Sequence, residues 1–160
     1  MRRLLSNGLV VFAGMVSLPS SVTHYHLSVA GTPPAETRFD PRLDSLKKFF
    51  EERGCPALAV AEVFLQAADA YGLDWRLLPS ISFVESTGGK QLKNNNLFGW
   101  DSGRAQFASL SSAIHAVAFA LANSSLYKDK DLDTVLETYN PDAEYAQKVK
   151  SVMQRISPSE

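Results

Sequence analysis

Glu85 is the side chain in this sequence that is best placed to do chemistry. It lies in ISFVES at 81–86, at the edge of an apolar helical face and near the predicted end of its helix. Partial burial and the negative end of the helix dipole, worth roughly 0.3–1 kcal/mol, both disfavour the charged carboxylate and raise its pKa. A general acid needs such a shift to hold its proton near neutral pH. Position alone still favours the plainer alternative of a solvated glutamate in a last helical turn.

Four motifs accompany Glu85 along the chain. They read ESTGGK at 85–90, NNNLFGW at 94–100, TYNP at 138–141 and EYAQKV at 144–149. Together they resemble the glucosaminidase and lysozyme-like group of bacterial wall-lytic enzymes, over roughly residues 58–156. In that group a catalytic Glu precedes a Ser and a Gly-rich turn, an Asn-Asn-x-Phe-Gly motif opens the substrate groove, and a tyrosine-bearing motif closes the site. The resemblance implies a lysozyme-like fold and cleavage of β-1,4 links in peptidoglycan glycan, as in mannosyl-glycoprotein endo-β-N-acetylglucosaminidase-like domains.

The resemblance also implies roles for individual residues. Glu85 is the expected catalytic acid, and Tyr139 matches a family tyrosine whose phenol lies close to that acid and could polarise groups around the scissile bond. The expected substrate-binding residues are Ser86, Asn95, Asn96, Phe98, Trp100 and Tyr145. Each has a structural alternative: packing for the aromatic residues, turn formation for the asparagines and capping of the helix end for the serine.

A second carboxylate is harder to find than the first. Glycoside hydrolysis by the usual route needs two acids at a defined separation. Asp101 is the acidic residue of the predicted hairpin, and it is our candidate for the second catalytic carboxylate. It is also a suitable turn residue before Ser-Gly. Without it, a mechanism with Glu85 as the sole acid and base remains, as in lytic transglycosylases, or the N-acetyl group of the substrate assists.

Other chemistries find little support in the sequence. The three histidines, His24, His26 and His115, are too scattered for a metal site, and the lone Cys55 favours neither a disulfide nor a cysteine-rich metal centre. A formal net charge of -1 gives no broad basic surface for nucleic acid. We therefore predict no metal, no cofactor and no nucleic-acid partner.

Helical elements must position these side chains. Apolar spacing, caps and glycine stops predict six helices near residues 40–54, 60–72, 74–89, 109–121, 131–139 and 144–156. Leu97–Trp100 and Arg104–Phe107 flank Asp101-Ser102-Gly103 and predict one short β-hairpin. The expected class is mainly α, or α+β with very little β, in a lysozyme-like arrangement.

The N-terminal residues predict export. Met1-Arg2-Arg3 precedes the short apolar run at 9–18, which favours a signal peptide over 1–30, with an uncleaved membrane anchor as the alternative. Residues 31–39 are predicted to form a flexible tether, and 40–157 the folded domain. We expect a monomer in the periplasm, the cell envelope or the medium.

Three functions compete at this point. The first is an exported glycosidase acting on peptidoglycan glycan or a related amino-sugar polymer. The second is a lytic transglycosylase that uses Glu85 alone. The third is a glycan-binding module without catalysis, which the doubtful second carboxylate favours and the retained Glu85 and Tyr139 oppose.

Overall fold

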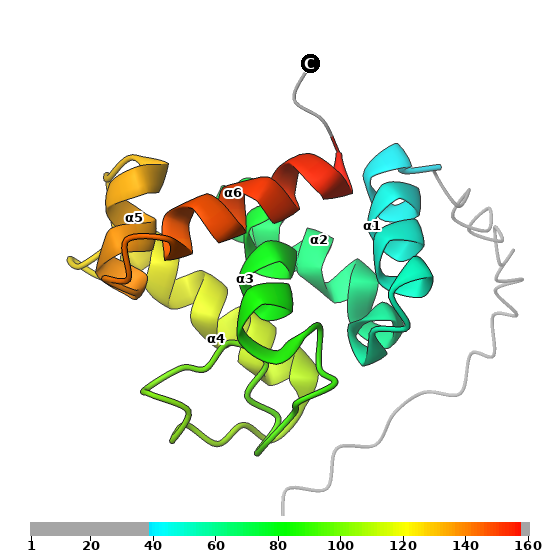
Figure 1. Ribbon diagram of the computed structural model, residues 1–160, viewed down its shortest axis with the longest axis horizontal. Coiled ribbons are helices and arrows are strands. Elements are labelled where there is room, and N and C mark those ends of the chain that lie inside the picture. Colours follow the sequence, from blue (N-terminus) through cyan, green and yellow to red (C-terminus); the bar gives the residue numbers. More distant parts are fainter. Residues whose placement is uncertain (1–38, 158–160) are drawn as a thin grey trace, which may run out of the picture. The chain divides into compact units, whose positions relative to one another are not determined.

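Residues 39–157 are described in the computed structural model, and helices account for most of them. Six α-helices and one 3-10 helix follow one another (Figure 1). Their bounds are α1 Pro41–Glu52, η1 Pro56–Val60, α2 Ala61–Tyr71, α3 Leu77–Ser86, α4 Leu110–Asn123, α5 Leu132–Tyr139 and α6 Tyr145–Ile156. The prediction of a mainly α chain with about six helices is confirmed.

Side-chain caps begin three of these helices where the sequence predicted them. The carboxylate of Asp40 accepts a hydrogen bond from the backbone of Arg42 at 2.9 Å, and that of Asp131 accepts one from Thr134 at the same distance. Ser109 and Ser112 form a reciprocal capping box at the start of α4. Each cap satisfies amides that have no partner inside the helix, so the local sequence is enough to fix these starts.

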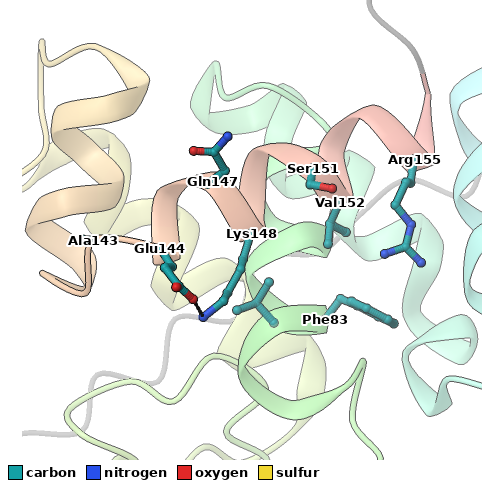
Figure 2. A pocket seen from close by; sticks show the side chains of 9 residues that line it. Phe83, Ala143, Glu144, Gln147, Lys148, Ser151, Val152 and Arg155 are labelled. Atoms are coloured by element: carbon teal, nitrogen blue, oxygen red, sulfur yellow. Dashed lines mark ion pairs between the residues drawn. The ribbon is translucent and has the colours of Figure 1, made fainter.

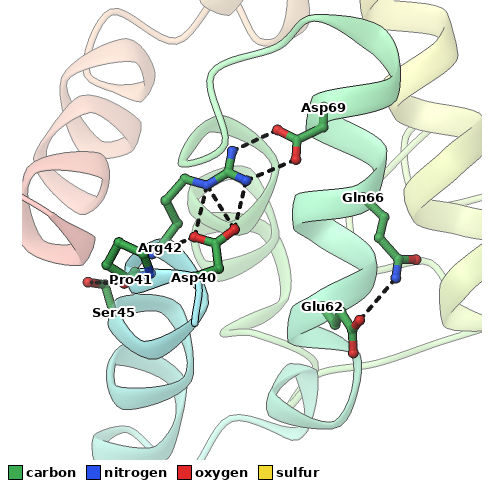
Figure 3. A network of polar contacts seen from close by, with 7 residues as sticks. All are labelled: Asp40, Pro41, Arg42, Ser45, Glu62, Gln66 and Asp69. Carbon is green, nitrogen blue, oxygen red and sulfur yellow. Dashed lines mark hydrogen bonds and ion pairs between the residues drawn. The ribbon is translucent and has the colours of Figure 1, made fainter. Parts of the chain in front are cut away.

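A polar network ties the start of α1 to α2 (Figure 3). The guanidinium of Arg42 lies between two carboxylates, 2.8 Å from that of Asp40 and 2.7 Å from that of Asp69. Hydrogen bonding to this guanidinium lowers the pKa of both carboxyl groups. All three side chains are partly exposed, so each pair contributes only about 0–1 kcal/mol.

The core is built on α3 and on a row of phenylalanine rings. In Figure 1, α6 crosses α3, and the two helices pack against each other, as α2 does against α4. The ring centroids of Phe50 and Phe64 lie 5.8 Å apart, and those of Phe64 and Phe98 lie 6.3 Å apart. Phe98 belongs to the long connection between α3 and α4, so this connection is anchored in the core.

That connection does not form the predicted β-hairpin, and no strand occurs between residues 39 and 157. Gly99, inside the first predicted strand, has a φ of +59°. Extended strands need negative φ, so this strand cannot run unbroken through residues 97–100. The backbone instead closes turns, such as the hydrogen bond of 2.8 Å from the Gly103 amide to the Gly99 carbonyl.

The predicted N-terminal segments fall outside this description. The signal peptide or anchor at 1–30 and the tether up to residue 38 are not among the described residues. Within 39–157, none of the helices combines the length and apolar character needed to cross a membrane.

Gly88 packs against Cys55, where the chain leaves α3. A Cβ atom on Gly88 would lie 2.8 Å from both the Cβ and the Sγ of Cys55, and the φ of Gly88 is +61°. The lone cysteine is therefore a packing residue that requires a glycine opposite it. Burial raises the pKa of its thiol, which keeps it in the unreactive, protonated form.

We expect Gly88→Ala to lower the free energy of unfolding by about 1–3 kcal/mol more than Gly54→Ala does. Gly54 has a similar φ of +56° but open space around it, so the two variants share the backbone strain and differ in the collision with Cys55. Urea unfolding of both variants measures the difference. Equal losses would show that the packing at Cys55 does not limit stability.

Candidate active site

Glu85 is the penultimate residue of α3, and its side chain is half-buried. Its carboxylate lies directly against the backbone of Gly99. A Cβ atom on Gly99 would overlap the Oε2 of Glu85 and lie 3.1 Å from its Cδ, and the φ of Gly99 is +59°. The positive φ favours glycine, and a Cβ atom at this position would force the Glu85 carboxylate to move. The close approach brings the 97–100 segment over the end of α3 and removes part of the carboxylate from water.

Ser86 fixes the end of α3 and does not face a ligand. Its side chain is 3% exposed, and its hydroxyl lies 2.8 Å from the Leu97 carbonyl and 3.0 Å from the Ser82 carbonyl. The same oxygen accepts a hydrogen bond from the Gly89 amide at 3.1 Å. Of the roles considered from the sequence, the structure therefore supports the one in which Ser86 holds the helix end that carries Glu85.

Asn96 organises the loop from within. Its side chain is 6% exposed, and its Oδ1 accepts from the amides of Phe98 at 3.3 Å and Trp100 at 3.0 Å. Its Nδ2 donates to the carbonyls of Trp100 at 3.0 Å and Ala105 at 3.3 Å. These four bonds use the hydrogen-bonding capacity of the amide, so none is left for an N-acetyl group of a substrate.

Two more loop residues that were expected to bind substrate, Phe98 and Asn95, make contacts within the protein. Phe98 is fully buried in the core, and the Asn95 side chain donates to the Phe107 carbonyl at 2.9 Å. Asn95 is half-buried, so part of its side chain faces solvent. The NNNLFG motif thus builds the loop. It fixes the positions of the Gly99 backbone and of the Trp100 side chain.

Aromatic rings cover the loop on its other side. Tyr139 and Tyr145 are stacked, with centroids 5.9 Å apart and an interplanar angle of 8°. Trp100 lies against Tyr139 at 5.7 Å and against Tyr127 at 6.3 Å. The Tyr139 hydroxyl donates to the Phe98 carbonyl at 2.5 Å, which ties α5 to the loop. Because this hydroxyl is committed to the loop, Tyr139 positions Gly99 and Trp100.

A surface hollow of about 490 Å³ lies beside the aromatic rings. Its lining residues are Gly99, Trp100, Asp101, Ser102, Tyr127 and Tyr139. Three of them, Trp100, Asp101 and Tyr139, were expected from the sequence. Tyr127 was not expected, since it lies in the connection between α4 and α5 and no motif surrounds it. The one signal in the sequence is an aromatic residue in a largely polar stretch.

Asp101 reaches the hollow but not as a free carboxylate. It pairs with Arg104 at 2.6 Å, and both side chains are exposed. The pKa of Glu85 responds to burial and to Tyr145, and no neighbouring carboxylate is among the causes of its shift. The structure thus brings Asp101 to the rim of the hollow as one half of an exposed ion pair.

The electrostatics of the site favour a protonated Glu85. Burial raises the pKa of its carboxyl group, and the hydroxyl of Tyr145 partly offsets this by lowering it. Burial and the charge of Glu85 in turn raise the pKa of Tyr139 and of Tyr145, so both phenols keep their protons. The arrangement offers a carboxylic acid able to donate a proton at a higher pH than an ordinary glutamate.

The Tyr145 hydroxyl lies close to the Glu85 carboxyl group. It is near enough to Glu85 to shift the pKa of the carboxyl group, yet it makes no hydrogen bond of ordinary geometry to any residue in 39–157. Its side chain is 4% exposed. The hydroxyl and the carboxyl group are therefore neighbours whose geometry falls short of a regular hydrogen bond.

The rest of the described chain holds no obvious metal centre. No group of three or more His, Cys, Asp or Glu side chains within 39–157 is arranged to hold a metal ion. His115 lies edge-on to Tyr71, with centroids 6.2 Å apart, and His24 and His26 are outside the described residues.

Comparison of the chain with protein-family models, curated proteins and solved structures found no match.

Tyr145→Phe should raise the pKa of Glu85 further. The tyrosine hydroxyl lowers this pKa, so its removal leaves burial unopposed. A ¹³C NMR titration of the glutamate side-chain carboxyl groups measures the shift. Tyr127→Phe is the matched control, because Tyr127 belongs to the same aromatic cluster but does not shift the pKa of Glu85. A lower pKa in Tyr145→Phe, or an equal rise in both variants, would contradict this account.

Proposed function

We propose that this chain is a glycosidase that cleaves β-1,4 links of peptidoglycan glycan, an endo-β-N-acetylglucosaminidase-like enzyme with a lysozyme-like arrangement of helices. One observation carries the proposal: the Glu85 carboxyl is half-buried against Gly99, its pKa is raised by that burial, and Gly99 also lines an aromatic hollow. The order of the four motifs supports the same activity. Export through the N-terminal segment and action as a monomer belong to this proposal.

The proposed chemistry begins with proton transfer from Glu85. The protonated carboxyl donates its proton to the glycosidic oxygen as the bond from that oxygen to the anomeric carbon breaks. The bonding electrons leave with the oxygen, and positive charge develops on the sugar ring. The oxygen of a water molecule then forms a bond to the anomeric carbon, and the Glu85 carboxylate left behind accepts the proton that this water releases. Its raised pKa suits both steps, since the acid is retained near neutral pH and is recovered at the end.

The hollow that Gly99 lines has a composition suited to a sugar. Trp100, Tyr127 and Tyr139 provide apolar ring surface, while Ser102 and Asp101 provide polar groups at the rim. Binding sites for small ligands commonly combine aromatic walls with a few polar groups that fix orientation. A sugar ring fits this combination, with apolar C–H faces and polar hydroxyl edges.

A transglycosylase outcome is the second candidate, and the electrostatics of Glu85 favour it. Two-acid hydrolysis needs a second carboxylate at a set separation from the first. Asp101 is paired with Arg104, and no carboxylate contributes to the pKa shift of Glu85. In a one-acid reaction the attacking hydroxyl belongs to the sugar itself, so an anhydro ring forms in place of a new reducing end.

Glu85→Gln should abolish most cleavage and leave the fold intact. General acid catalysis contributes about 10²–10⁴-fold, and glutamine cannot donate the proton. Zymography and release of soluble fragments from peptidoglycan measure the loss. Glu137→Gln is the matched control, since Glu137 is an exposed glutamate of α5. Equal clearing by Glu85→Gln and wild type would remove Glu85 from the mechanism and favour a binding module.

The same variant should also alter the dependence of stability on pH. Burial raises the pKa of Glu85 in the folded state above its unfolded value, so the folded protein binds the proton more tightly. Stability is therefore favoured below the unfolded pKa and is lost as the pH rises through the folded one. Chemical unfolding at several pH values should show this loss in wild type and a smaller one in Glu85→Gln. A larger loss in the variant would contradict the burial of a costly charge.

Asp101→Asn separates the two outcomes. Under the one-acid mechanism the rate stays within about twofold of wild type, because the lost group is not the base, whereas loss of a catalytic acid or base costs about 10²–10⁴-fold. Mass spectrometry of the products provides the second readout. Anhydro-muramic ends identify transglycosylation and new reducing ends identify hydrolysis. A large loss of rate together with reducing ends would establish Asp101 as the second carboxylate.

A further inference from the structure

A second and larger hollow, of about 660 Å³, lies between α3 and α6 (Figure 2). Small-molecule sites in proteins span roughly 300–1,000 Å³, so it has room for a ligand of a few residues. Phe83 and Val84 form one side of this α3–α6 groove, and both are only half-buried despite being apolar. Its other lining residues come from α6 or the turn before it: Ala143, Glu144, Gln147, Lys148, Ser151, Val152 and Arg155.

The α3–α6 groove carries one positive charge that nothing described here compensates. Lys148 pairs with Glu144 at 2.9 Å, as the dashed line in Figure 2 marks. Arg155 forms no ion pair with any residue in 39–157, and its guanidinium lies 5.8 Å from the ring centroid of Phe83 and 6.0 Å from that of Phe49. Arg155 is exposed, so its donors stay open to solvent or to a ligand, in a chain whose formal net charge is -1.

The groove also lies next to the candidate acid along both helices. Val84 lines it and Glu85 is the next residue of α3, while Glu144 lines it and Tyr145, the neighbour of Glu85, is the next residue. Gly99, which the Glu85 carboxylate approaches closely, lines the aromatic hollow. Glu85 is thus a sequence neighbour of residues that line the groove and a spatial neighbour of one that lines the aromatic hollow.

We propose that the α3–α6 groove binds a short acidic peptide, with a carboxylate of the peptide on Arg155 and its apolar groups on Phe83 and Val84. A guanidinium binds carboxylates in two parallel hydrogen bonds, which gives this contact direction as well as strength. The identity of the peptide rests on the proposed function. Peptidoglycan glycan carries short peptides rich in carboxylates, and the groove is placed to hold such a peptide while its glycan is cleaved at Glu85.

A second copy of this chain fits the groove less well. Packing a copy onto it would bury the guanidinium of Arg155 together with the polar ends of Gln147 and Ser151. An unpaired buried charge opposes association strongly. An acidic peptide supplies the missing carboxylate, so charge complementarity decides between the two occupants.

The test uses the full-length Glu85→Gln protein, labelled with ¹⁵N, and the synthetic tripeptide L-Ala-γ-D-Glu-meso-diaminopimelate. We expect chemical shift changes at Ser151, Val152 and the Arg155 guanidinium. Arg155→Gln should weaken binding by about tenfold or more, as loss of a charge-assisted contact does. Arg53→Gln is the matched control, because Arg53 also lies over the Phe49 ring, at 4.1 Å, but does not line the groove. The peptide with its carboxylates amidated should bind as weakly as the charged peptide binds to Arg155→Gln.

Several results would overturn the inference. Equal binding of the charged and amidated peptides, or shifts confined to other residues, would remove Arg155 and the groove. Concentration-dependent dimerisation that is lost in Val84→Asp would make a second copy the occupant. The outcome is independent of catalysis. If Glu85→Gln loses cleavage and the peptide does not bind, the proposed function stands and the peptide site is wrong. If the peptide binds but Glu85→Gln cleaves as well as wild type, the peptide site stands and the proposed role of Glu85 is wrong.

Discussion

Contact between the Glu85 carboxylate and the backbone of Gly99 is the constraint on which the rest of the site depends. The contact leaves no room for a Cβ atom on Gly99, and it needs the loop to stay in place although no strand holds it. Three side chains supply what a sheet would have supplied. Asn96 bonds the loop to itself, Ser86 joins it to α3, and Tyr139 joins it to α5. Each uses its polar atoms on backbone carbonyls or amides, and Asn96 and Ser86 do so while buried.

The half-buried position of Glu85 has a cost in stability. A carboxyl group withdrawn from water is costly to ionise, and burial raises the pKa of Glu85 for this reason. Tyr145 moderates the cost, since its hydroxyl lowers the pKa that burial raises. Burial and the Tyr145 hydroxyl thus act in opposite directions on the protonation of Glu85.

The helices could be predicted from the sequence because their signals are local. Caps such as Asp40 and Ser109 act within a few residues, and the spacing of apolar side chains marks the buried faces. The loop could not be predicted in the same way. Leu97 and Phe98 suggested a strand by composition, but the conformation of the loop is decided by the amide of Asn96 and by a run of positive φ values. Glu85 is a candidate because of its motif, whereas no motif marks Tyr127, since only tertiary packing brings Tyr127 to Trp100.

The order in which the site is assembled follows from where its parts lie in the chain. Glu85 ends α3, whereas Tyr145 begins α6, the last helix of the described chain. A chain that has been synthesised only as far as α5 lacks the ring that stacks on Tyr139 and the hydroxyl that faces Glu85. Its glutamate is then more exposed to water and closer to an ordinary carboxylate. The environment that shifts the pKa of Glu85 is therefore complete only when the last helix of the described chain has packed against α3.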